Sequence, residues 1–222
     1  MYNVVTHRKL VRAVQNKRRE QILTGMTWKY SVVTSRQIAD TYFATCKDSL
    51  RQAERFLEGM IRTGFIAKRT VMAHLLTAPN VPLFSWEIGQ SPFDANAVKN
   101  VIDNRWVIEL VPTTIYSATR KAVNAFGGQL AKSIQTLHIC HDLYCASVYL
   151  SKEEFFPEEA ADWLSERVYE SHLSEHEKPG DARLRSQGED YRLIEILGRY
   201  TLEHIQAIHP YCESRNLPYE LW

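Results

Sequence analysis

Polar and apolar positions in the first third of the chain follow a helical period. Thr34 to Gln37 has the Ser/Thr-x-x-Gln spacing of a capping box, which predicts that a helix begins there. The apolar side of this helix would consist of Ile38, Ala39, Tyr42 and Phe43. After a short polar break, Asp48 or Ser49 can accept hydrogen bonds from the first amides of another helix. The pattern predicts two consecutive helices joined by a tight turn.

The second of these helices has two clearly different sides. Its apolar side would consist of Leu50, Ala53, Leu57, Met60 and Ile61. At about 100° per residue, the opposite side carries Arg51, Gln52, Arg55 and Arg62. Gly64 is placed to end the helix. Two helices joined by a tight turn, the second exposing Arg and Gln near its start, are typical of a DNA-binding helix-turn-helix.

Two β-prone stretches, 65–72 and 83–88, follow the second predicted helix. The segment between them, 77–82, contains two prolines and an asparagine, so we expect a hairpin over 65–88. A helix-turn-helix followed by a hairpin resembles the winged-helix family, in which the hairpin is the wing.

On this interpretation, helix residues read base edges and wing residues hold phosphates. The predicted DNA contacts are Arg36, Ser49, Arg51, Gln52 and Arg55 in the helices and Lys68 and Arg69 in the wing. The alternative is a small helical core whose arginines only solvate its outer face.

Charge is distributed unevenly along the chain, although its formal net value is only +1. Residues 1–70 hold 14 Lys and Arg against 5 Asp and Glu, whereas the remainder holds 13 against 21. A basic section with a helix-turn-helix pattern is the electrostatic footprint expected for a polyanion such as double-stranded DNA. Lys17, Arg18 and Arg19 either contact phosphates or form a solvated helix face. The acidic remainder leaves open a homodimer or an interaction module that docks a basic protein.

The composition is that of an ordinary soluble globular protein, with 45% hydrophobic and 24% charged residues among 222. No apolar run approaches the roughly 20 residues needed to cross a bilayer, and residues 1–10 lack the apolar core of a signal peptide. The four cysteines form no C-x-x-C pair, so neither a zinc framework nor a disulfide framework is indicated. We therefore expect a reduced, cytoplasmic protein with no membrane partner.

The middle of the chain reads as a series of helices. They are predicted over 11–26, 95–107, 115–126 and 129–150, with a short strand over 28–32 and a linker over 90–94. This linker divides the chain into domains 1–90 and 91–222. His138-x-x-His141 has a spacing that could hold a metal, but a buried histidine with a hydrogen-bond partner is the commoner explanation. The same applies to His172 and His176.

The last third contains a predicted strand, 191–197, with Glu195 surrounded by apolar residues. Burying an unpaired carboxylate is costly, so an inward-facing Glu195 needs a cation, a metal or a donor. A helix over 201–212, bent or ended early by Pro210, and a β-prone end over 217–222 follow.

The order helix, strand, Asp-bearing strand, Glu-bearing strand, helix, strand resembles the core of the PD-(D/E)XK nuclease-like fold. The chain also has a Trp-x-x-Glu segment, Trp163 to Glu166, before a Pro-Asp-Ala-like element, Pro179 to Ala182. With a winged helix in front, it resembles the replication-relaxation family of plasmid- and phage-associated DNA-binding proteins. The resemblance implies a mixed α/β fold: an N-terminal winged helix-turn-helix plus a C-terminal restriction-endonuclease-like α/β core.

By this resemblance Glu166, Asp181 and Glu195 are the acidic trio of an active nuclease, with Mg²⁺ held by Asp181 and Glu195. Two departures matter: Gly180 splits the Pro-Asp pair, and Leu197 stands where the family has its catalytic Lys. The alternative to a nuclease site is that Asp181 is a turn residue and Glu195 is a salt-bridged strand residue. We therefore expect no catalysis and no cofactor.

The expected function is sequence-specific binding of double-stranded DNA in the replication control or transcription of a plasmid, phage or other mobile element. The alternative is a Mg²⁺-dependent DNA endonuclease targeted by its winged helix.

Overall fold

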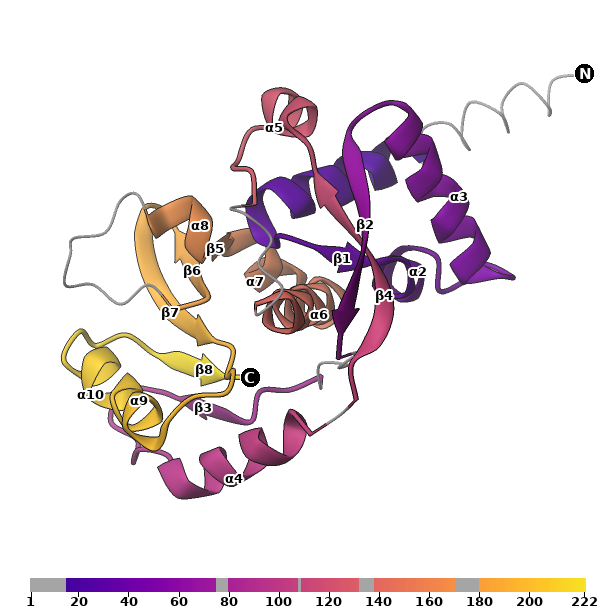
Figure 1. Ribbon diagram of the computed structural model, residues 1–222. Helices are drawn as coiled ribbons and strands as arrows, with labels where there is room; N and C mark the ends of the chain where they lie inside the picture. Colours follow the sequence, from indigo (N-terminus) through magenta and orange to yellow (C-terminus); the bar gives the residue numbers. More distant parts are fainter. Residues whose placement is uncertain (1–14, 75–79, 108, 132–137, 171–179) are drawn as a thin grey trace, which may run out of the picture.

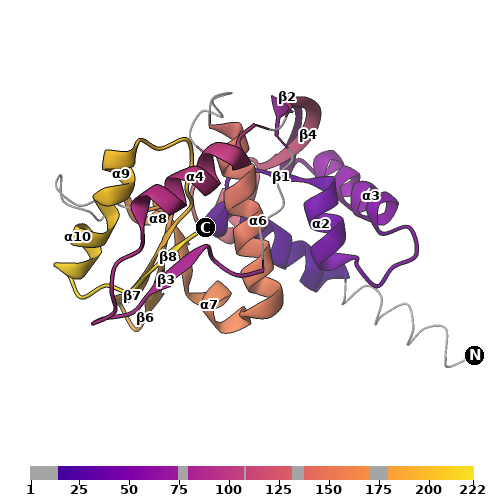
Figure 2. The same cartoon turned by 90° about the horizontal axis from the view of Figure 1, so that it is seen from below.

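The computed structural model describes residues 15–74, 80–107, 109–131, 138–170 and 180–222 (Figure 1). The fold is mixed α/β, with a three-stranded sheet and a five-stranded sheet. Figures 1 and 2 show these sheets on opposite sides of the long helix α6 (Ile139–Phe155). The segments 1–14, 75–79 and 171–179 lie outside the described residues, together with His172 and His176.

The three-stranded sheet supports the helices predicted at the start of the chain. A helical segment at 15–24 continues into a π-helical turn, η1 (Gly25–Lys29). The following elements are β1 (Val33–Thr34), α2 (Ser35–Tyr42), α3 (Ser49–Arg62), β2 (Ile66–Ala73) and β4 (Val111–Ala118). The strands are antiparallel, in the order β1-β4-β2.

Local signals in this region are confirmed at both ends of the predicted helix pair. The Thr34 side chain accepts from the Gln37 amide, and the Gln37 side chain accepts from the Thr34 amide, as a capping box requires. Gly64 has φ of 75°, and the Phe65 amide donates to the Met60 carbonyl, which closes the end of α3. Asp48 precedes α3 but makes no capping hydrogen bond through its side chain, so that part of the prediction is wrong.

The predicted hairpin over 65–88 is wrong, because β2 and β3 (Phe84–Trp86) belong to different sheets. β2 pairs along its whole length with β4, from Ile66 opposite Ala118 to Ala73 opposite Val111. β3 pairs instead with β8 (Tyr219–Leu221). The helix predicted from residue 115 therefore begins only after β4, as α5 (Arg120–Phe126). Because the chain crosses between the sheets before and after α4 (Ala95–Arg105), a boundary at residue 90 does not separate them.

The five-stranded sheet has the order β3-β8-β7-β6-β5. Its remaining strands are β5 (Trp163–Ser165), β6 (Ala182–Ser186) and β7 (Glu189–Glu195). β7 and β8 are parallel, and the other neighbours are antiparallel. The helices nearest in sequence are α7 (Pro157–Asp162), α8 (Glu166–Tyr169), α9 (Leu202–Gln206) and α10 (Ile208–Glu213). In chain order, the elements after α6 are α7, β5, α8, β6, β7, α9, α10 and β8.

One further prediction differs from the structure, and another is confirmed. The strand expected over 28–32 is absent among the described residues, because Trp28 lies inside η1, where its ring nitrogen donates to the Phe126 carbonyl at 3.0 Å. The helix expected over 201–212 is not continuous but divided at Ala207, between α9 and α10, so the interruption expected from Pro210 is confirmed. Pro210 explains this division, since its ring excludes a continuous helix at the carbonyl four residues earlier.

The two sheets share one hydrophobic core, which runs from Ile22 near the start of the described chain to Trp222 at its end. Polar contacts reinforce this packing. The Arg167 guanidinium donates to the carbonyls of Met26 and Tyr30 at 2.7 and 2.8 Å, and the Ser165 hydroxyl donates to the Trp28 carbonyl at 2.7 Å. The elements around α3 are therefore held against the rest of the chain.

Candidate functional site

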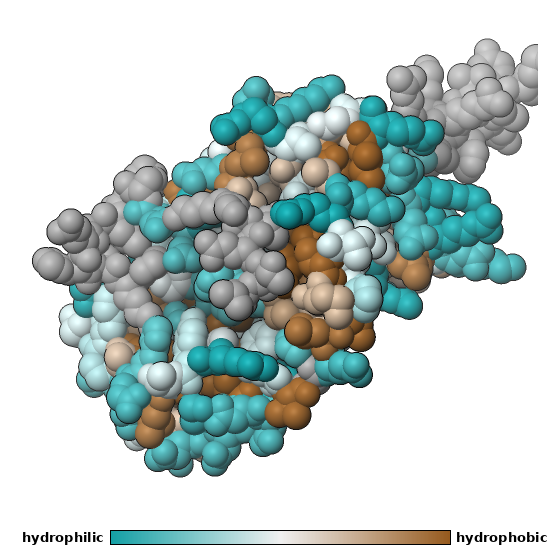
Figure 3. Space-filling view, in the orientation of Figure 1, coloured by the Kyte–Doolittle hydropathy of each residue, from teal (hydrophilic) through white to brown (hydrophobic). Residues whose placement is uncertain are grey.

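Helix α3 presents the polar side that the sequence predicted. Ala53 and Leu57 are fully buried, so Arg51, Gln52 and Arg55 point outward and are exposed. Arg51 and Arg55 make no hydrogen bond or ion pair with any other described residue, whereas Gln52 donates to the Lys47 carbonyl at 3.1 Å. The surface over α3 is strongly hydrophilic in Figure 3. Two guanidinium groups are thus available to a partner.

A groove of about 500 Å³ runs between α3 and the helical segment at 15–24. We call it the basic groove; its charged residues are Arg18, Arg19, Lys47, Asp48, Arg51 and Arg55. Five cations face one carboxylate, so the groove is suited to an anion. Arg18 and Arg19 therefore belong to the same surface as α3. The sequence alone did not decide whether they share a binding surface or only a solvated helix face.

The arginines of the first helical segment are held in place by aromatic rings. The Arg18 guanidinium lies 4.3 Å from the centre of the Phe43 ring, and that of Arg19 lies 4.7 Å from the centre of the Phe65 ring. Arg19 also donates to the Thr63 hydroxyl at 3.2 Å. These contacts orient the two cations beside α3 at little additional entropic cost on binding.

The other predicted DNA contacts lie outside the basic groove. Arg36 is exposed and forms an ion pair with Asp40 at 3.8 Å, and Ser49 is partly buried as the first residue of α3. Lys68 and Arg69 are exposed on β2. As consecutive strand residues, these two point to opposite faces, so they cannot both contact one surface in the same way.

The β6–β7 hairpin brings together two of the three predicted acidic residues. Asp181 directly precedes β6, and its amide donates to the Ile194 carbonyl at 3.1 Å, which places it beside Glu195 at the end of β7. Glu195 is 2% exposed and accepts a hydrogen bond from the Tyr200 side chain. Glu166 has an exposed side chain, and its amide donates to the Asp181 carbonyl at 2.8 Å.

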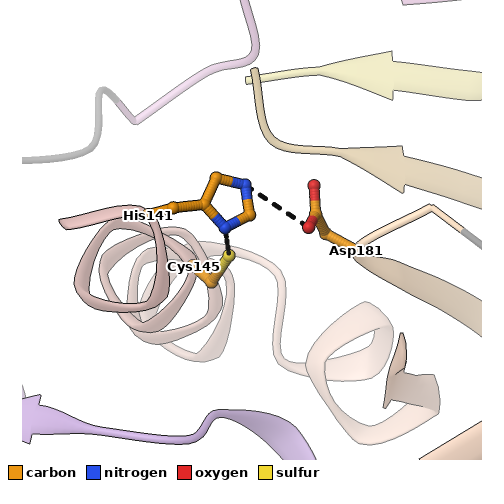
Figure 4. A group of neighbouring side chains, drawn as sticks. All are labelled: His141, Cys145 and Asp181. Carbon is orange, nitrogen blue, oxygen red and sulfur yellow. Dashed lines mark hydrogen bonds and ion pairs between the residues drawn. The ribbon is translucent and has the colours of Figure 1, made fainter. Parts of the chain in front are cut away.

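Two residues of α6 complete the surroundings of Asp181 (Figure 4). His141 Nε2 lies 3.4 Å from Asp181 Oδ1 and 2.8 Å from the Ile196 carbonyl oxygen, while His141 Nδ1 lies 3.5 Å from Cys145 Sγ. We call these three side chains the His-Cys-Asp cluster. His138 is exposed, so the histidine pair considered from the sequence is not formed. The His-x-x-x-Cys spacing on one helix face was the available signal for Cys145.

For His141 and for Cys145, burial and the contacts with neighbouring groups shift the pKa in opposite directions. Burial raises the pKa of the Cys145 thiol to about 12, so it is protonated at neutral pH. Burial lowers the pKa of His141, but contacts with Cys145 and Asp181 outweigh it and raise that pKa well above its usual value. A thiol of this kind is not an activated nucleophile, because the reactive form is the thiolate.

The surroundings of Asp181 do not fit a magnesium site. Mg²⁺ takes oxygen ligands in octahedral geometry and keeps several waters. Asp181 instead faces an imidazole and a thiol, and Glu195 is bonded to Tyr200. Leu197 is fully buried at the position where the resemblance calls for a Lys. Arg199 donates to the Trp106 carbonyl at 2.8 Å, so it does not replace that Lys.

Comparison with known proteins adds no relative: the chain matches no protein-family model, no curated protein and no solved structure. Among the described helices, none combines the length and the apolar character that a membrane crossing requires.

Proposed function

We propose that this protein binds double-stranded DNA in a sequence-specific manner through α3 and the basic groove. The observation that carries the proposal is the pair Arg51 and Arg55, exposed on one side of α3 and without a partner among the described residues. An arginine can pair bidentately with guanine in the major groove, which contributes about 1–3 kcal/mol of discrimination. The surrounding cations of the basic groove would add phosphate contacts.

The order of elements supports a winged-helix mode of binding. A first helix, β1, α2, α3 and β2 follow one another, and β2 pairs with the later strand β4. In this order α3 would be the recognition helix and β2–β4 the wing. In this arrangement Lys68 or Arg69, which point to opposite faces of β2, would contact the DNA backbone beside the groove that α3 enters. The wing would differ from a simple hairpin, because its two strands are separated by β3 and α4.

The remaining elements would serve as a scaffold. The order α6, β5, β6, β7, α9–α10, β8 supports a nuclease-like core, as in the replication-relaxation proteins that the sequence resembles. Leu197 can neither carry a charge nor move a proton, so this core would lack the acid–base group that cleavage needs. We infer a role in the replication or transcription of a mobile element, in which the protein holds its site without cutting it.

Selection of bound duplexes from a random pool by the full-length protein, with and without Mg²⁺, tests this function. We expect one enriched motif, affinity that falls steeply with salt because bound cations release counterions, and intact duplexes under both conditions. Arg51→Ala should remove the enrichment. Arg215→Ala should retain it, because Arg215 is an exposed arginine in the turn after α10 and is no part of the basic groove. Recovery of random sequences, or binding that is indifferent to salt, would contradict the proposal. Cleavage in Mg²⁺ that is lost in Asp181→Ala would establish the endonuclease instead.

A further inference from the structure

We propose that the His-Cys-Asp cluster binds a divalent transition-metal ion of the zinc type. One nitrogen of His141, Cys145 Sγ and a carboxylate oxygen of Asp181 all lie within 4.8 Å of one another (Figure 4). His141 and Cys145 are one turn apart on α6, and Asp181 comes from the start of β6. The three donors therefore converge from two separate elements. This inference does not depend on DNA binding.

The donor atoms are those that zinc prefers. Imidazole nitrogen, thiolate sulfur and carboxylate oxygen are the three common zinc ligands, and a thiolate favours zinc over magnesium or calcium. With zinc–nitrogen and zinc–sulfur bonds of about 2.0 and 2.3 Å, the two ligand atoms of a tetrahedral ion lie about 3.5 Å apart. His141 Nδ1 and Cys145 Sγ are separated by 3.5 Å. This edge of the tetrahedron already has the required length.

The backbone of a single residue, Ile196, orients two of the ligands, His141 and Asp181. Its carbonyl accepts from His141 Nε2 at 2.8 Å, a shorter contact than the 3.4 Å to Asp181. This bond holds a proton on Nε2, so Nδ1, which faces Cys145, is the nitrogen that would lose its proton and bind a metal. The Ile196 amide donates to Asp181 Oδ2 at 2.7 Å and leaves Oδ1 for a metal. Metal-binding histidines are usually held by such a bond from the other ring nitrogen.

The position of Asp181 is fixed by a glycine. Gly180 has φ of 68°, and a Cβ atom there would lie 2.8 Å from Leu193 Cδ1. A residue with a side chain would have to displace the β7 neighbour or leave the left-handed region, so Asp181 reaches the cluster only from a glycine. Its carboxylate is thus positioned by rigid elements, as a preorganised site requires.

Three protein ligands leave one position of a tetrahedral ion open, as in zinc sites that bind a water or a small ligand. The His141 and Asp181 side chains are 23% and 12% exposed, so an ion can reach them from solvent. The side chains of His141 and Tyr200 both lie next to Gly198. Tyr200 also lines a cavity of 420 Å³, together with Lys99 and Arg199. On binding, the Cys145 thiol and His141 Nδ1 each release a proton to solvent, and the thiolate and the neutral imidazole coordinate the metal.

Titration of the metal-free, full-length protein with Co²⁺ tests the site, because cobalt replaces zinc and a cobalt–thiolate bond has a charge-transfer absorption. We expect one equivalent to bind with this band, and Zn²⁺ to displace it. Cys145→Ser should abolish the band, and Asp181→Asn, which is nearly isosteric, should weaken binding by at least about tenfold. Cys46→Ser is the matched control, because Cys46 lies in the turn before α3 and should leave the titration unchanged.

Thermal unfolding provides a second measurement that does not rely on the absorption band. Zn²⁺ should raise the Tm of the wild-type protein and of Cys46→Ser, because an ion that binds only the folded state stabilises it. Should Cys145→Ser not fold, Asp181→Asn takes its place in both experiments. Absence of the band in the wild type, or its persistence in Cys145→Ser or at full affinity in Asp181→Asn, overturns the proposal.

Discussion

The Gln37 side-chain amide donates a hydrogen bond to the Ser147 hydroxyl at 2.7 Å, across 110 residues of sequence. The same nitrogen donates to the Leu143 carbonyl at 2.7 Å, while the Gln37 side-chain oxygen accepts from the Thr34 amide. One side chain therefore closes the capping box of α2 and ties α2 to α6. The α2–α3 helix pair and the helix that carries the His-Cys-Asp cluster are joined at this point.

Gln37→Glu should separate these two roles, because a carboxylate keeps the capping acceptor but loses both donors to α6. We expect a loss of about 1–3 kcal/mol in the free energy of unfolding, since a carboxylate can no longer donate to the Leu143 carbonyl and the Ser147 hydroxyl. Urea denaturation followed by circular dichroism measures it. Gln52→Glu, an exposed change on α3, should shift stability by no more than about 0.5 kcal/mol. Equal effects of the two substitutions would show that the link to α6 contributes nothing.

Arg55→Ala and Lys68→Ala should have different effects on DNA binding. Arg55 lies on the outer side of α3, so its loss should reduce the preference for the selected motif by about 1–3 kcal/mol and leave random duplexes nearly unaffected. Lys68 lies on β2, so its loss should weaken all sequences alike and lower the salt slope by about one. Fluorescence anisotropy on matched and random duplexes at several salt concentrations distinguishes the two. If the two variants lose specificity equally, the assigned roles are wrong.

Gly180→Ala should destabilise the protein more than Gly188→Ala does. Both glycines have a positive φ, so both substitutions incur backbone strain. At Gly180 the added Cβ would also meet Leu193 at 2.8 Å, whereas at Gly188 no atom lies within 4 Å. The difference between their Tm values therefore isolates the contact with Leu193, and we expect it to correspond to at least about 1 kcal/mol. Identical Tm values would mean that β7 yields freely to the new methyl group.

Lys29 should make stability rise with pH above neutrality. Burial lowers its pKa to about 8, against the opposing charges of Asp162 and Glu153, while its nitrogen donates to the carbonyls of Ala161 and Trp163. Above pH 8 the unfolded chain binds this proton more readily than the folded one, so raising the pH favours the folded state. Between pH 8 and 9.5 the free energy of unfolding should rise by about 2 kcal/mol at most through Lys29.

Lys29→Met provides the comparison for this pH dependence, because other groups titrate equally in both proteins. The difference in unfolding free energy between wild type and Lys29→Met should grow in favour of the wild type as the pH rises from 7.5 to 9.5. A difference that stays constant over this range would show that the Lys29 pKa is not lowered by folding.

The sequence by itself determined the features that depend on near neighbours. The capping box at Thr34 and Gln37 and the helix end at Gly64 each involve residues within a few positions, so their geometry follows from local residue types. The exposed side of α3 follows from a helical period that Ala53 and Leu57 set. These signals are short-range, and tertiary contacts did not override them.

Only the tertiary structure decided which distant segments meet. Residues 115–118 have a helix-like apolar pattern, but pairing with β2 makes them a strand, because a long ladder of backbone hydrogen bonds outweighs a weak local preference. Phe84 and Trp86 mark a strand in the sequence, yet their partner β8 is more than 130 residues away. Cys145 and Asp181 meet for the same reason. Periodicity specifies which side of an element is buried, whereas the element that covers it depends on packing across the whole chain.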